Sequence, residues 1–375
     1  MASFLRMFQP AGQEVIETGI DRGKVSVDYR NVSERPLSKR QTEYRENTMN
    51  EISPKEVSEL YNRITRELGR VIVGQEQIVR LLLVSLFARG HCLLVGVPGL
   101  AKTLIVRTLA DILHLGFRRI QFTPDLMPAD IIGSEVLQER ERRLEYEYKP
   151  GPVFANLILA DEINRTPPKT QAALLEAMQE HKVTVGGQSR VLPDPFLVVA
   201  TQNPIEQEGT YPLPEAQLDR FMFSLYLDYP AKAEEIEIVK RTTLRELPTL
   251  TPTVAVEDLL RVQRLVLAAP VSDHVIDYAV SLASATRPAN PKASKMSRDF
   301  VEWGAGPRAS QYLILGAKAL ALLKGKISPE TAEVREVAMH VLQHRVITNY
   351  RATGAGKKSR DIVQGLLTEV PEQNY

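Results

Sequence analysis

The sequence contains a single cysteine, Cys92, and no long hydrophobic run. One cysteine cannot build an internal disulfide framework, so we expect a reducing compartment and place the protein in the cytoplasm. No apolar stretch approaches the roughly 18 to 20 residues that span a bilayer, which predicts no direct membrane insertion. Residues 1–17 lack a long apolar segment before the first acidic side chains, so we expect no secretory signal.

An excess of either charge is also missing, because 47 basic and 46 acidic side chains leave a net charge of +1. Such a chain has no overall field that attracts a phosphate backbone, so we expect no nucleic-acid partner. The charged fraction of 25% and the hydrophobic fraction of 43% are typical of a globular protein. With 375 residues, the chain is longer than one usual domain, and we expect two or three units.

Three regions differ in pattern. Residues 1–50 are polar with little apolar periodicity, which predicts an extended or disordered arm. At Ser53 a helix start is indicated, with a capping serine followed by proline and glutamate. Residues 51–230 then alternate strands and helices, whereas residues 231–375 show only helical spacing. We therefore predict an α/β core followed by a smaller all-helical unit.

The strands of the core are short apolar runs, and several are continuous rather than alternating, as in strands buried on both faces. The alternation of strands and helices along the sequence predicts a mostly parallel sheet with helices on both sides. The predicted strands are 91–96, 118–123, 155–162, 196–204 and 221–229. One further stretch, 182–192, alternates about a Gly-Gly pair and predicts a β-hairpin.

The stretch GVPGLAKT, which follows the first core strand, matches the phosphate-loop pattern except at one position. Gly96 opens it, Lys102 and Thr103 close it, and Ala101 replaces the second glycine. The residues expected to surround the phosphates are Gly96, Pro98, Gly99, Leu100 and Ala101. Their backbone N–H groups, which only proline lacks, and the helix dipole favour phosphate there. We expect Lys102 to reach the terminal phosphates and Thr103 to bind Mg²⁺. A glycine-rich turn without ligand is the alternative, and alanine at 101 is strained only if its φ is positive.

Two adjacent carboxylates, Asp161 and Glu162, end another apolar run. They are expected at the carboxyl edge of a parallel sheet, where ligands of open α/β sheets bind. Asp161 could hold Mg²⁺ through its water shell, and Glu162 could polarise an attacking water. By itself the pair could also be an acidic helix start, but the nearby Lys102 favours the nucleotide interpretation.

With these motifs in place, residues 53–371 resemble the MoxR group of AAA+ ATPases, whose phosphate loop also has alanine before lysine. The resemblance implies a P-loop AAA+ core, in which a parallel sheet is sandwiched by helices, plus an all-helical lid. It also implies ATP and Mg²⁺ as ligands. Residues 133–152 fall where this group has an insert in its second core helix, and 182–192 where it has a hairpin ahead of sensor 1.

The resemblance assigns further roles. Asn203 matches sensor 1, which orients the attacking water, and Arg220 matches the arginine finger that serves a neighbouring subunit. Arg308 matches sensor 2, directed at the phosphates so that bound nucleotide ties the lid to the core. Val73 and Gly74 match the segment beside adenine. From the residues alone, Arg220 could equally pair with Asp219 or Glu215 on a solvated helix face.

Together these features predict an ATP-hydrolysing ring, implied by the resemblance to be a hexamer, that remodels or activates partner proteins. The resemblance also suggests a partner with a von Willebrand factor A domain. Two alternatives stay open. One is a nucleic-acid-linked AAA+ motor, against which stand the balanced charge and the absence of an obvious winged-helix segment. The other is an ATP-gated assembly scaffold with little turnover, for which Ala101 and the long arm leave room.

Overall fold

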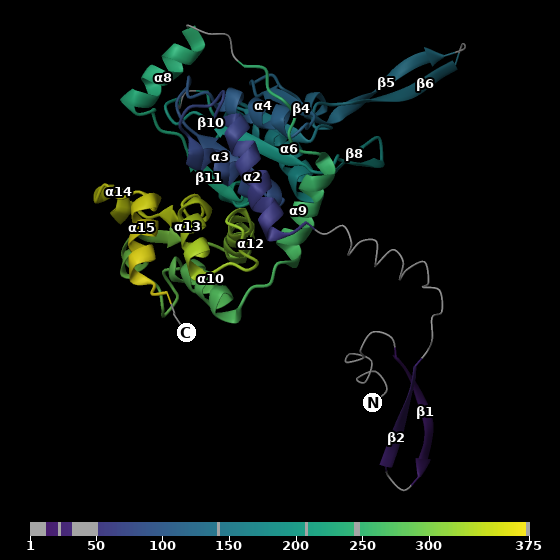
Figure 1. The fold of residues 1–375 in the computed structure, drawn as a ribbon. Helices are drawn as coiled ribbons and strands as arrows, with labels where there is room; N and C mark the ends of the chain where they lie inside the picture. Colours follow the sequence, from purple (N-terminus) through teal and green to yellow (C-terminus); the bar gives the residue numbers. More distant parts are fainter. Residues whose placement is uncertain are drawn as a thin grey trace. The chain divides into compact units, whose positions relative to one another are not determined.

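The computed structural model describes residues 13–21, 24–31, 52–140, 143–206, 209–243 and 248–372. The chain forms two units, Met1–Glu51 and Ile52–Tyr375. In the first unit, β1 (Gln13–Asp21) pairs antiparallel with β2 (Lys24–Asn31), as Figure 1 shows. We expected an extended or disordered arm over residues 1–50 and did not predict this strand pair. The rest of the arm lies outside the described residues.

A five-stranded parallel sheet forms the centre of the second unit. Its order is β11-β3-β10-β7-β4. Every strand overlaps a stretch predicted from its apolar run, and the parallel order confirms the α/β class. The bounds are β3 (Cys92–Val95), β4 (Phe117–Gln121), β7 (Leu157–Asp161), β10 (Leu197–Gln202) and β11 (Phe223–Tyr226).

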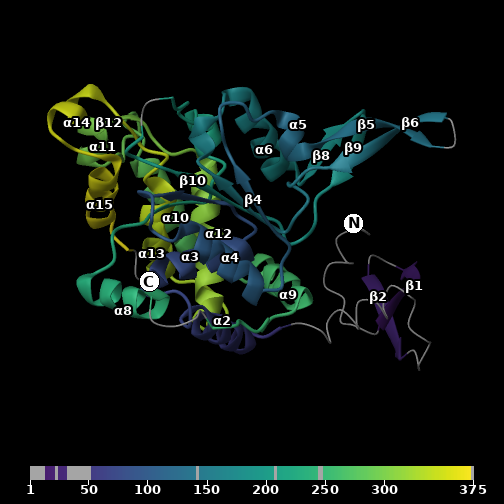
Figure 2. The ribbon, with the colours of Figure 1, turned by 90° about the horizontal axis from the view of Figure 1, so that it is seen from above.

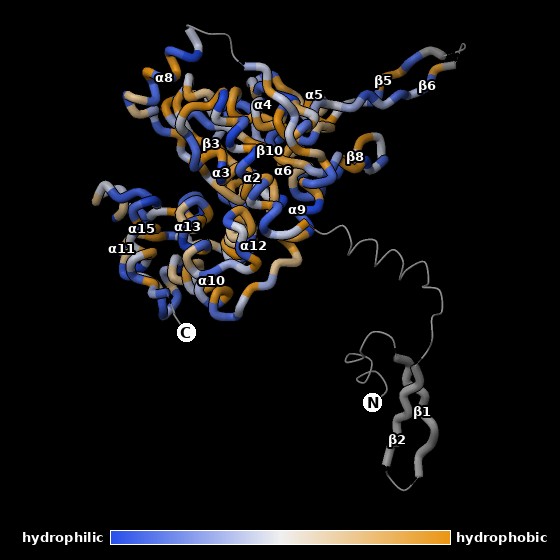
Figure 3. Tube along the Cα trace, viewed as in Figure 1, coloured by the Kyte–Doolittle hydropathy of each residue, from blue (hydrophilic) through white to orange (hydrophobic). Residues whose placement is uncertain are grey.

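The two faces of the sheet bury separate hydrophobic clusters, because alternate strand residues point to opposite sides. Cys92 and Leu94 belong to one cluster, and Leu93 and Val95 to the other. These apolar segments lie in the interior in Figure 3. The first cluster includes residues of α2 (Pro54–Leu68), α3 (Glu76–Phe87) and α4 (Lys102–Ile112), and the second residues of α5 (Pro128–Ile132) and α6 (Pro168–Glu180). Helices therefore cover both faces, and ligands can reach the sheet at its edges.

Two β-hairpins project on the same side of the core (Figures 1 and 2). The pairing of β8 (Lys182–Val185) with β9 (Gln188–Val191) confirms the predicted hairpin, and its two glycines have φ of +59° and +75°. The predicted insert contains a longer hairpin, β5 (Gly133–Arg140) with β6 (Arg143–Pro150), whose strands the sequence did not reveal. The Arg190 guanidinium lies 3.8 Å from the Tyr148 ring centroid, so the hairpins contact each other.

Helices dominate the carboxyl-terminal region, although the expectation of an entirely helical unit missed one small strand pair. In that pair β12 (Val301–Trp303) lies antiparallel to β13 (Ile347–Thr348). The helices are α8 (Lys232–Thr243), α9 (Val256–Ala268), α10 (Asp273–Ala285), α11 (Lys295–Phe300), α12 (Pro307–Leu323), α13 (Thr331–Leu342), α14 (Tyr350–Gly354) and α15 (Ser359–Glu369).

The lid and the sheet share one hydrophobic cluster. Leu313 of α12 and Val337 of α13 belong to the same cluster as Phe223 of β11. The α-carbon of Gly316 allows this approach, because a Cβ there would lie 3.2 Å from the Met222 side chain. In contrast, α8 has no buried residue and lies apart from α10–α15 in Figure 1.

Within the described part of the chain, no single helix is both long and apolar enough to cross a membrane. Only α9 and α10 taken together meet that test there, and they are bent by 91° at the break between them.

Candidate nucleotide-binding site

The phosphate-loop motif lies at the carboxyl end of β3 and opens α4, as the sequence predicted. Lys102 is the first residue of α4, and its Nζ donates to the carbonyl oxygens of Gly96 at 2.5 Å and Val97 at 3.3 Å. Partial burial lowers the pKa of Lys102, while the carboxylates of Asp161 and Glu162 act in the opposite direction. The ammonium group is thus held over the loop by two carbonyl oxygens and lies within electrostatic range of two acids.

Ala101 adopts the left-handed conformation, with φ of 54° and ψ of 22°. This settles the question that the sequence left open about the alanine. A Cβ in this region meets the following carbonyl oxygen, so a non-glycine residue costs about 1 to 2 kcal/mol there. Gly99 has a φ of +87°, and a Cβ at this position would meet no atom of the described residues within 4 Å. Gly99 is therefore an open point of the loop, with a backbone conformation that favours glycine.

Asp161 lies next to the loop at the carboxyl end of β7 and is 8% exposed. Its Oδ1 accepts a hydrogen bond from the Thr201 hydroxyl at 2.6 Å. Its Oδ2 accepts from Arg119, whose Nη2 lies at 2.6 Å. Arg119 is on the neighbouring strand β4, where Gln121 pairs with Asp161 in the sheet register. The nearly buried carboxylate is therefore neutralised by a cation and oriented by a hydroxyl.

Glu162 follows directly and has a φ of 57° at the start of the 3-10 helix η2 (Ile163–Arg165). Its backbone N–H donates to the Thr201 hydroxyl at 2.8 Å. One carboxylate oxygen, Oε2, accepts from Gln121 at 2.9 Å and lies 3.1 Å from Arg165 Nε. Both side chains thus hold the same oxygen of Glu162.

Arg165 also pairs with Glu206, in the loop that follows β10. This hydrogen bond lowers the pKa of Glu206, and the side chain of Asn203 contributes in the same direction. Asn203 is 7% exposed, and its Oδ1 accepts from the Ile205 backbone at 3.2 Å. The predicted sensor residue therefore lies within the same polar network as Glu162, reached through Arg165.

A small, mainly apolar cavity of about 110 Å³ lies beside the phosphate loop. It is lined by Val73, by Gly99 to Ala101, and by Ile238 and Thr242 of α8. Apolar walls with few polar groups suit a flat aromatic base. Gly74, predicted to contact the base as well, does not line this cavity; it lies under Glu234, whose carboxylate would be 2.6 Å from a Cβ at this position.

The residues at this edge are compatible with Mg²⁺. A hard divalent cation prefers oxygen ligands and is usually bound through one or two carboxylates plus substrate phosphates. Asp161 and the Thr103 hydroxyl offer protein oxygens of this kind. Over the described residues, no group of three or more histidine, cysteine or acidic side chains could form a metal site without such phosphates.

The two predicted arginines lie at the other edge of the sheet. Arg220 lies between α7 (Glu215–Leu218) and β11. Two residues after it, Met222 donates its backbone N–H to the His91 carbonyl at 2.8 Å. His91 precedes β3, whereas the phosphate loop follows it. Four strand residues at about 3.3 Å each therefore separate the Arg220 end of β3 from the loop by about 13 Å.

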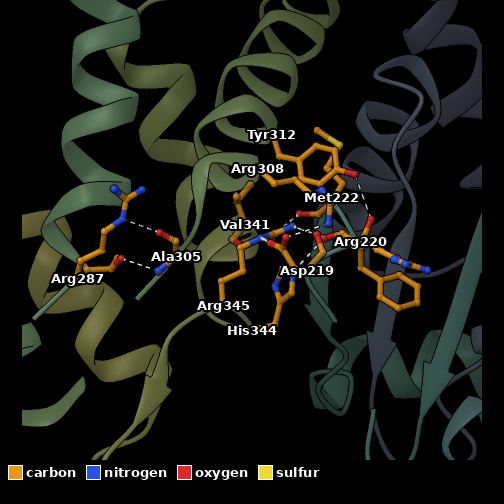
Figure 4. Close-up of polar contacts among 12 residues, drawn as sticks. Asp219, Arg220, Met222, Arg287, Ala305, Arg308, Tyr312, Val341, His344 and Arg345 are labelled. Carbon is orange, nitrogen blue, oxygen red and sulfur yellow. Dashed lines mark hydrogen bonds and ion pairs between the residues drawn. The ribbon is translucent and has the colours of Figure 1, made fainter. Parts of the chain in front are cut away.

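Arg308 lies beside the segment that carries Arg220, because residues of α12 contact both Asp219 and Arg220. Its Nη1 donates to Asp219 Oδ2 at 3.0 Å, and Tyr312 donates to the Arg220 carbonyl at 3.1 Å. Figure 4 shows this cluster between lid and core. Within the described residues, no hydrogen bond or ion pair is formed by the Arg220 side chain. The pairing of Arg220 with Asp219 or Glu215, considered from the sequence, is therefore not what the structure has.

Arg345 completes the cluster and is 6% exposed. Its Nε donates to Asp219 Oδ1 at 2.7 Å, and its Nη2 donates to the carbonyls of Asp219 and Phe221, each at 2.7 Å. Burial lowers the pKa of Arg345, and the Asp219 carboxylate opposes that shift. Asp219 thus joins two lid arginines to the segment that carries Arg220.

The sequence predicted that Arg308 is directed at phosphates and left open whether these belong to its own chain or to a neighbour; the structure places Arg308 on Asp219, in the segment that carries Arg220. The lid packs on the amino edge and on the α2–α3 side of the sheet, which takes Arg308 away from Lys102 and next to Arg220. The sequence also did not identify Arg119, Arg165, Thr201 and Glu206 as site residues. Arg119 and Gln121 alternate along one strand and so share a face, which is a signal, but the strand order that puts them beside Asp161 is not readable from the sequence.

Fold and site together define a P-loop nucleotide-binding protein with an α/β core and a lid. Comparison with known families agrees: residues 91–223 match the ATPase family associated with various cellular activities (AAA), and residues 293–366 match the AAA lid domain. The chain belongs to the MoxR family of AAA+ ATPases.

Relatives support this assignment along most of the chain. Chaperone MoxR1 of Mycobacterium tuberculosis is 47% identical over 286 residues, which cover 76% of this chain and 75% of that protein. YeaC of Bacillus subtilis, which is uncharacterised, is 42% identical, with 83% and 94% covered. Protein MoxR of Methylorubrum extorquens is 32% identical, with 76% and 86% covered. The crystal structure of a candidate ATPase from Cytophaga hutchinsonii has a TM-score of 0.78 and 42% identity, and covers 85% of this chain and 98% of its own.

Proposed function

We propose that this protein hydrolyses ATP with Mg²⁺ and uses the energy to remodel or activate partner proteins. The observation that carries this proposal is the placement of Lys102, Asp161 and Glu162 around one phosphate loop, next to an apolar cavity of about 110 Å³. The name of the relative Chaperone MoxR1 supports a role in handling other proteins. A cytoplasmic location is part of the same proposal.

Each residue of the loop edge has a role in the proposed reaction. Lys102 and the loop N–H groups bind the phosphates, and Val73 with the α8 side chains encloses the base. Asp161 and Thr103 would hold Mg²⁺, which would neutralise charge on the phosphates. Glu162 accepts a hydrogen bond from the attacking water through the carboxylate oxygen that Arg165 and Gln121 leave free. Asn203 orients that water from the end of β10.

The opposite edge supports an oligomer. Arg220 and Arg308 lie one strand length from their own phosphate loop, so in a closed ring they would serve the nucleotide of the neighbouring subunit. An arginine supplied in this way neutralises charge that develops during phosphoryl transfer. We propose a hexamer, as the family resemblance implies, with sensor 2 acting between subunits rather than within one.

Turnover by the wild type and by Glu162→Gln tests the proposed chemistry. The carboxamide cannot accept the water proton, so we expect phosphate release to fall at least about a hundredfold while ATP still binds. Lys102→Ala is the matched variant and should instead lose nucleotide binding, measured by calorimetry. Substantial and equal rates in the wild type and Glu162→Gln would refute the role of Glu162.

The partner can be sought with the same variant. We propose a client or a protein with a von Willebrand factor A domain, and Glu162→Gln held with ATP should keep it bound. Capture on this protein, compared with capture on Lys102→Ala, followed by mass spectrometry, identifies a nucleotide-dependent partner. Equal recovery on both variants would argue against nucleotide-controlled engagement.

A further inference from the structure

The single tryptophan of the chain, Trp303, is 67% exposed at the end of β12. It lines an open pocket of about 610 Å³, which is distinct from the cavity beside the phosphate loop. One wall belongs to the lid and includes Glu302 and Ile347, and the other belongs to the arginine-finger segment and includes Glu215 and Asp219. An exposed indole and two protein segments therefore frame one hollow.

Some of the acidic side chains that line the pocket have no ion-pair partner among the described residues. Asp219 is paired with Arg308 and Arg345. Glu215 and Glu302, in contrast, form no ion pair with another described residue, and they stand at the same rim as Trp303. A large aromatic side chain surrounded by polar groups is the arrangement found at the centre of protein–protein interfaces, where tryptophan, tyrosine and arginine provide most of the binding energy.

The position of the pocket indicates which protein covers it. Asp219 lines the pocket and also holds Arg308, and Arg220 is the next residue in the chain. Both arginines can meet a nucleotide only on another copy of the chain, because their own phosphate loop follows the far end of β3. A copy that brings its phosphate loop to Arg220 must also approach the surface around Trp303.

Charge complementarity supports the same occupant. The helix that starts at the phosphate loop, α4, carries Arg107, which is exposed and forms no ion pair with another described residue. Arg107 lies less than two turns from the phosphate loop, so it is available as a counter-charge for Glu215 if the loop of one copy faces Arg220 of the next.

We propose that the Trp303 pocket is an anchor of the subunit interface and is filled by the neighbouring copy of this chain. The inference rests on the proposed ring and adds to it a surface outside the residues that handle nucleotide. Trp303 packs against the neighbour, while Glu215 and Glu302 pair with its basic side chains.

The intrinsic fluorescence of Trp303 can report on its own environment, since the chain has no other tryptophan that contributes to the emission. Glu162→Gln with ATP should be studied over a dilution series, with assembly followed by analytical ultracentrifugation and Trp303 by fluorescence and acrylamide quenching. In the assembled samples we expect emission at shorter wavelength and a quenching constant lower by about twofold or more, as for an interface core residue. As a control, Trp303→Phe combined with Ile327→Trp puts the probe at another exposed site, where quenching should stay constant; Ile327 is 66% exposed.

A substitution gives the second readout. Trp303→Ala should raise the protein concentration for half-assembly about tenfold, with ATP affinity of the separate subunit unchanged, and Ile327→Ala should leave assembly as it is. Assembly of the wild type with Trp303 equally quenched at all concentrations would overturn the inference and leave the proposed function standing. If ATP binds but no assembly forms at any concentration, the proposed ring and this interface both fail.

Discussion

The Nε atom of Arg165 lies 3.1 Å from the Oε2 atom of Glu162. Gln121 donates to the same oxygen, so the other oxygen of the carboxylate is left for water. Glu206 holds the far end of the guanidinium. Arg165 therefore positions the proposed catalytic carboxylate, and its removal should affect chemistry more than binding.

For Arg165→Ala we expect kcat to fall about tenfold, equivalent to about 1.4 kcal/mol, with little change in KM for ATP. Steady-state phosphate release measures both constants. Arg165→Lys keeps a cation and should recover part of the loss. Arg118→Ala is the control, because Arg118 is exposed and donates a hydrogen bond to the carbonyl of Phe117, away from Glu162. An unchanged or higher kcat in Arg165→Ala would contradict the positioning role.

The phosphate loop offers a stability prediction at Ala101. Glycine relieves the strain of a left-handed alanine, while it increases the entropy of the unfolded chain. We expect Ala101→Gly to stabilise the fold by a few tenths to about 1 kcal/mol in denaturant unfolding. Ala110→Gly, at a buried position in the last turn of α4, should destabilise it by about 1 kcal/mol. A loss of stability in Ala101→Gly would mean that residue 101 is not left-handed in solution.

Removal of Asp219 should loosen the lid. The change leaves the buried guanidinium of Arg345 without its carboxylate, and breaking a buried pair in this way destabilises proteins by about 3 to 5 kcal/mol. We expect Asp219→Ala to lower the free energy of unfolding by about 3 kcal/mol in urea. Glu67→Ala breaks an exposed pair with Arg70, and its effect should stay within about 1 kcal/mol. Similar effects of the two variants would show that the Arg345 pair contributes little.

Two histidines, the buried His91 and the half-buried His340, predict how stability depends on pH. Burial lowers the pKa of His91 to about 4 and that of His340 to about 4, from a usual value of 6.5. The unfolded chain therefore binds more protons than the folded one between these values, so stability is fully present above pH 6.5 and is lost as the pH falls towards 4. Each histidine contributes a slope of about 1.4 kcal/mol per pH unit in that window.

Urea unfolding at several pH values measures this slope. His340→Gln keeps a polar group opposite Gln77, with which His340 shares a hydrogen bond, and should remove the contribution of one proton. His91 accepts from the Val198 N–H through Nδ1, so its neutral form is built into the sheet edge. A free energy of unfolding that stays constant between pH 6.5 and 4 would contradict both assignments.

Local chemistry explains which features the sequence predicted. The capping serine at Ser53, the Gly-Gly turn of the β8–β9 hairpin and the apolar strands each follow from residues close together in the chain. Lys102, Asp161 and Glu162 could be found because each stands where a strand ends. The positions of these three residues at strand ends are fixed by the alternation of strands and helices along the core.

Features that depend on packing between distant segments were not predictable in the same way. Arg165 and Glu206 meet only because β7 and β10 are neighbours, and Asp219 meets Arg345 across 126 positions of sequence. The placement of Arg308 followed from the side of the sheet to which the lid attaches. The side of the sheet to which the lid attaches is decided by the total apolar surface that α12 and α13 bury. No single sequence motif corresponds to that surface.

The hydrophobic cluster common to lid and sheet determines what can move. Pulling α12 and α13 away from β11 would bring Leu313, Val337 and Phe223 into contact with water, at a cost of about 1.5 to 3 kcal/mol for each side chain. This cost favours movement of the sheet and lid of one chain as a single block. In the proposed ring, the freedom that remains would be in α8, which has no buried residue, and in the joints between successive copies, so hydrolysis in one subunit would be transmitted as rotation of the next.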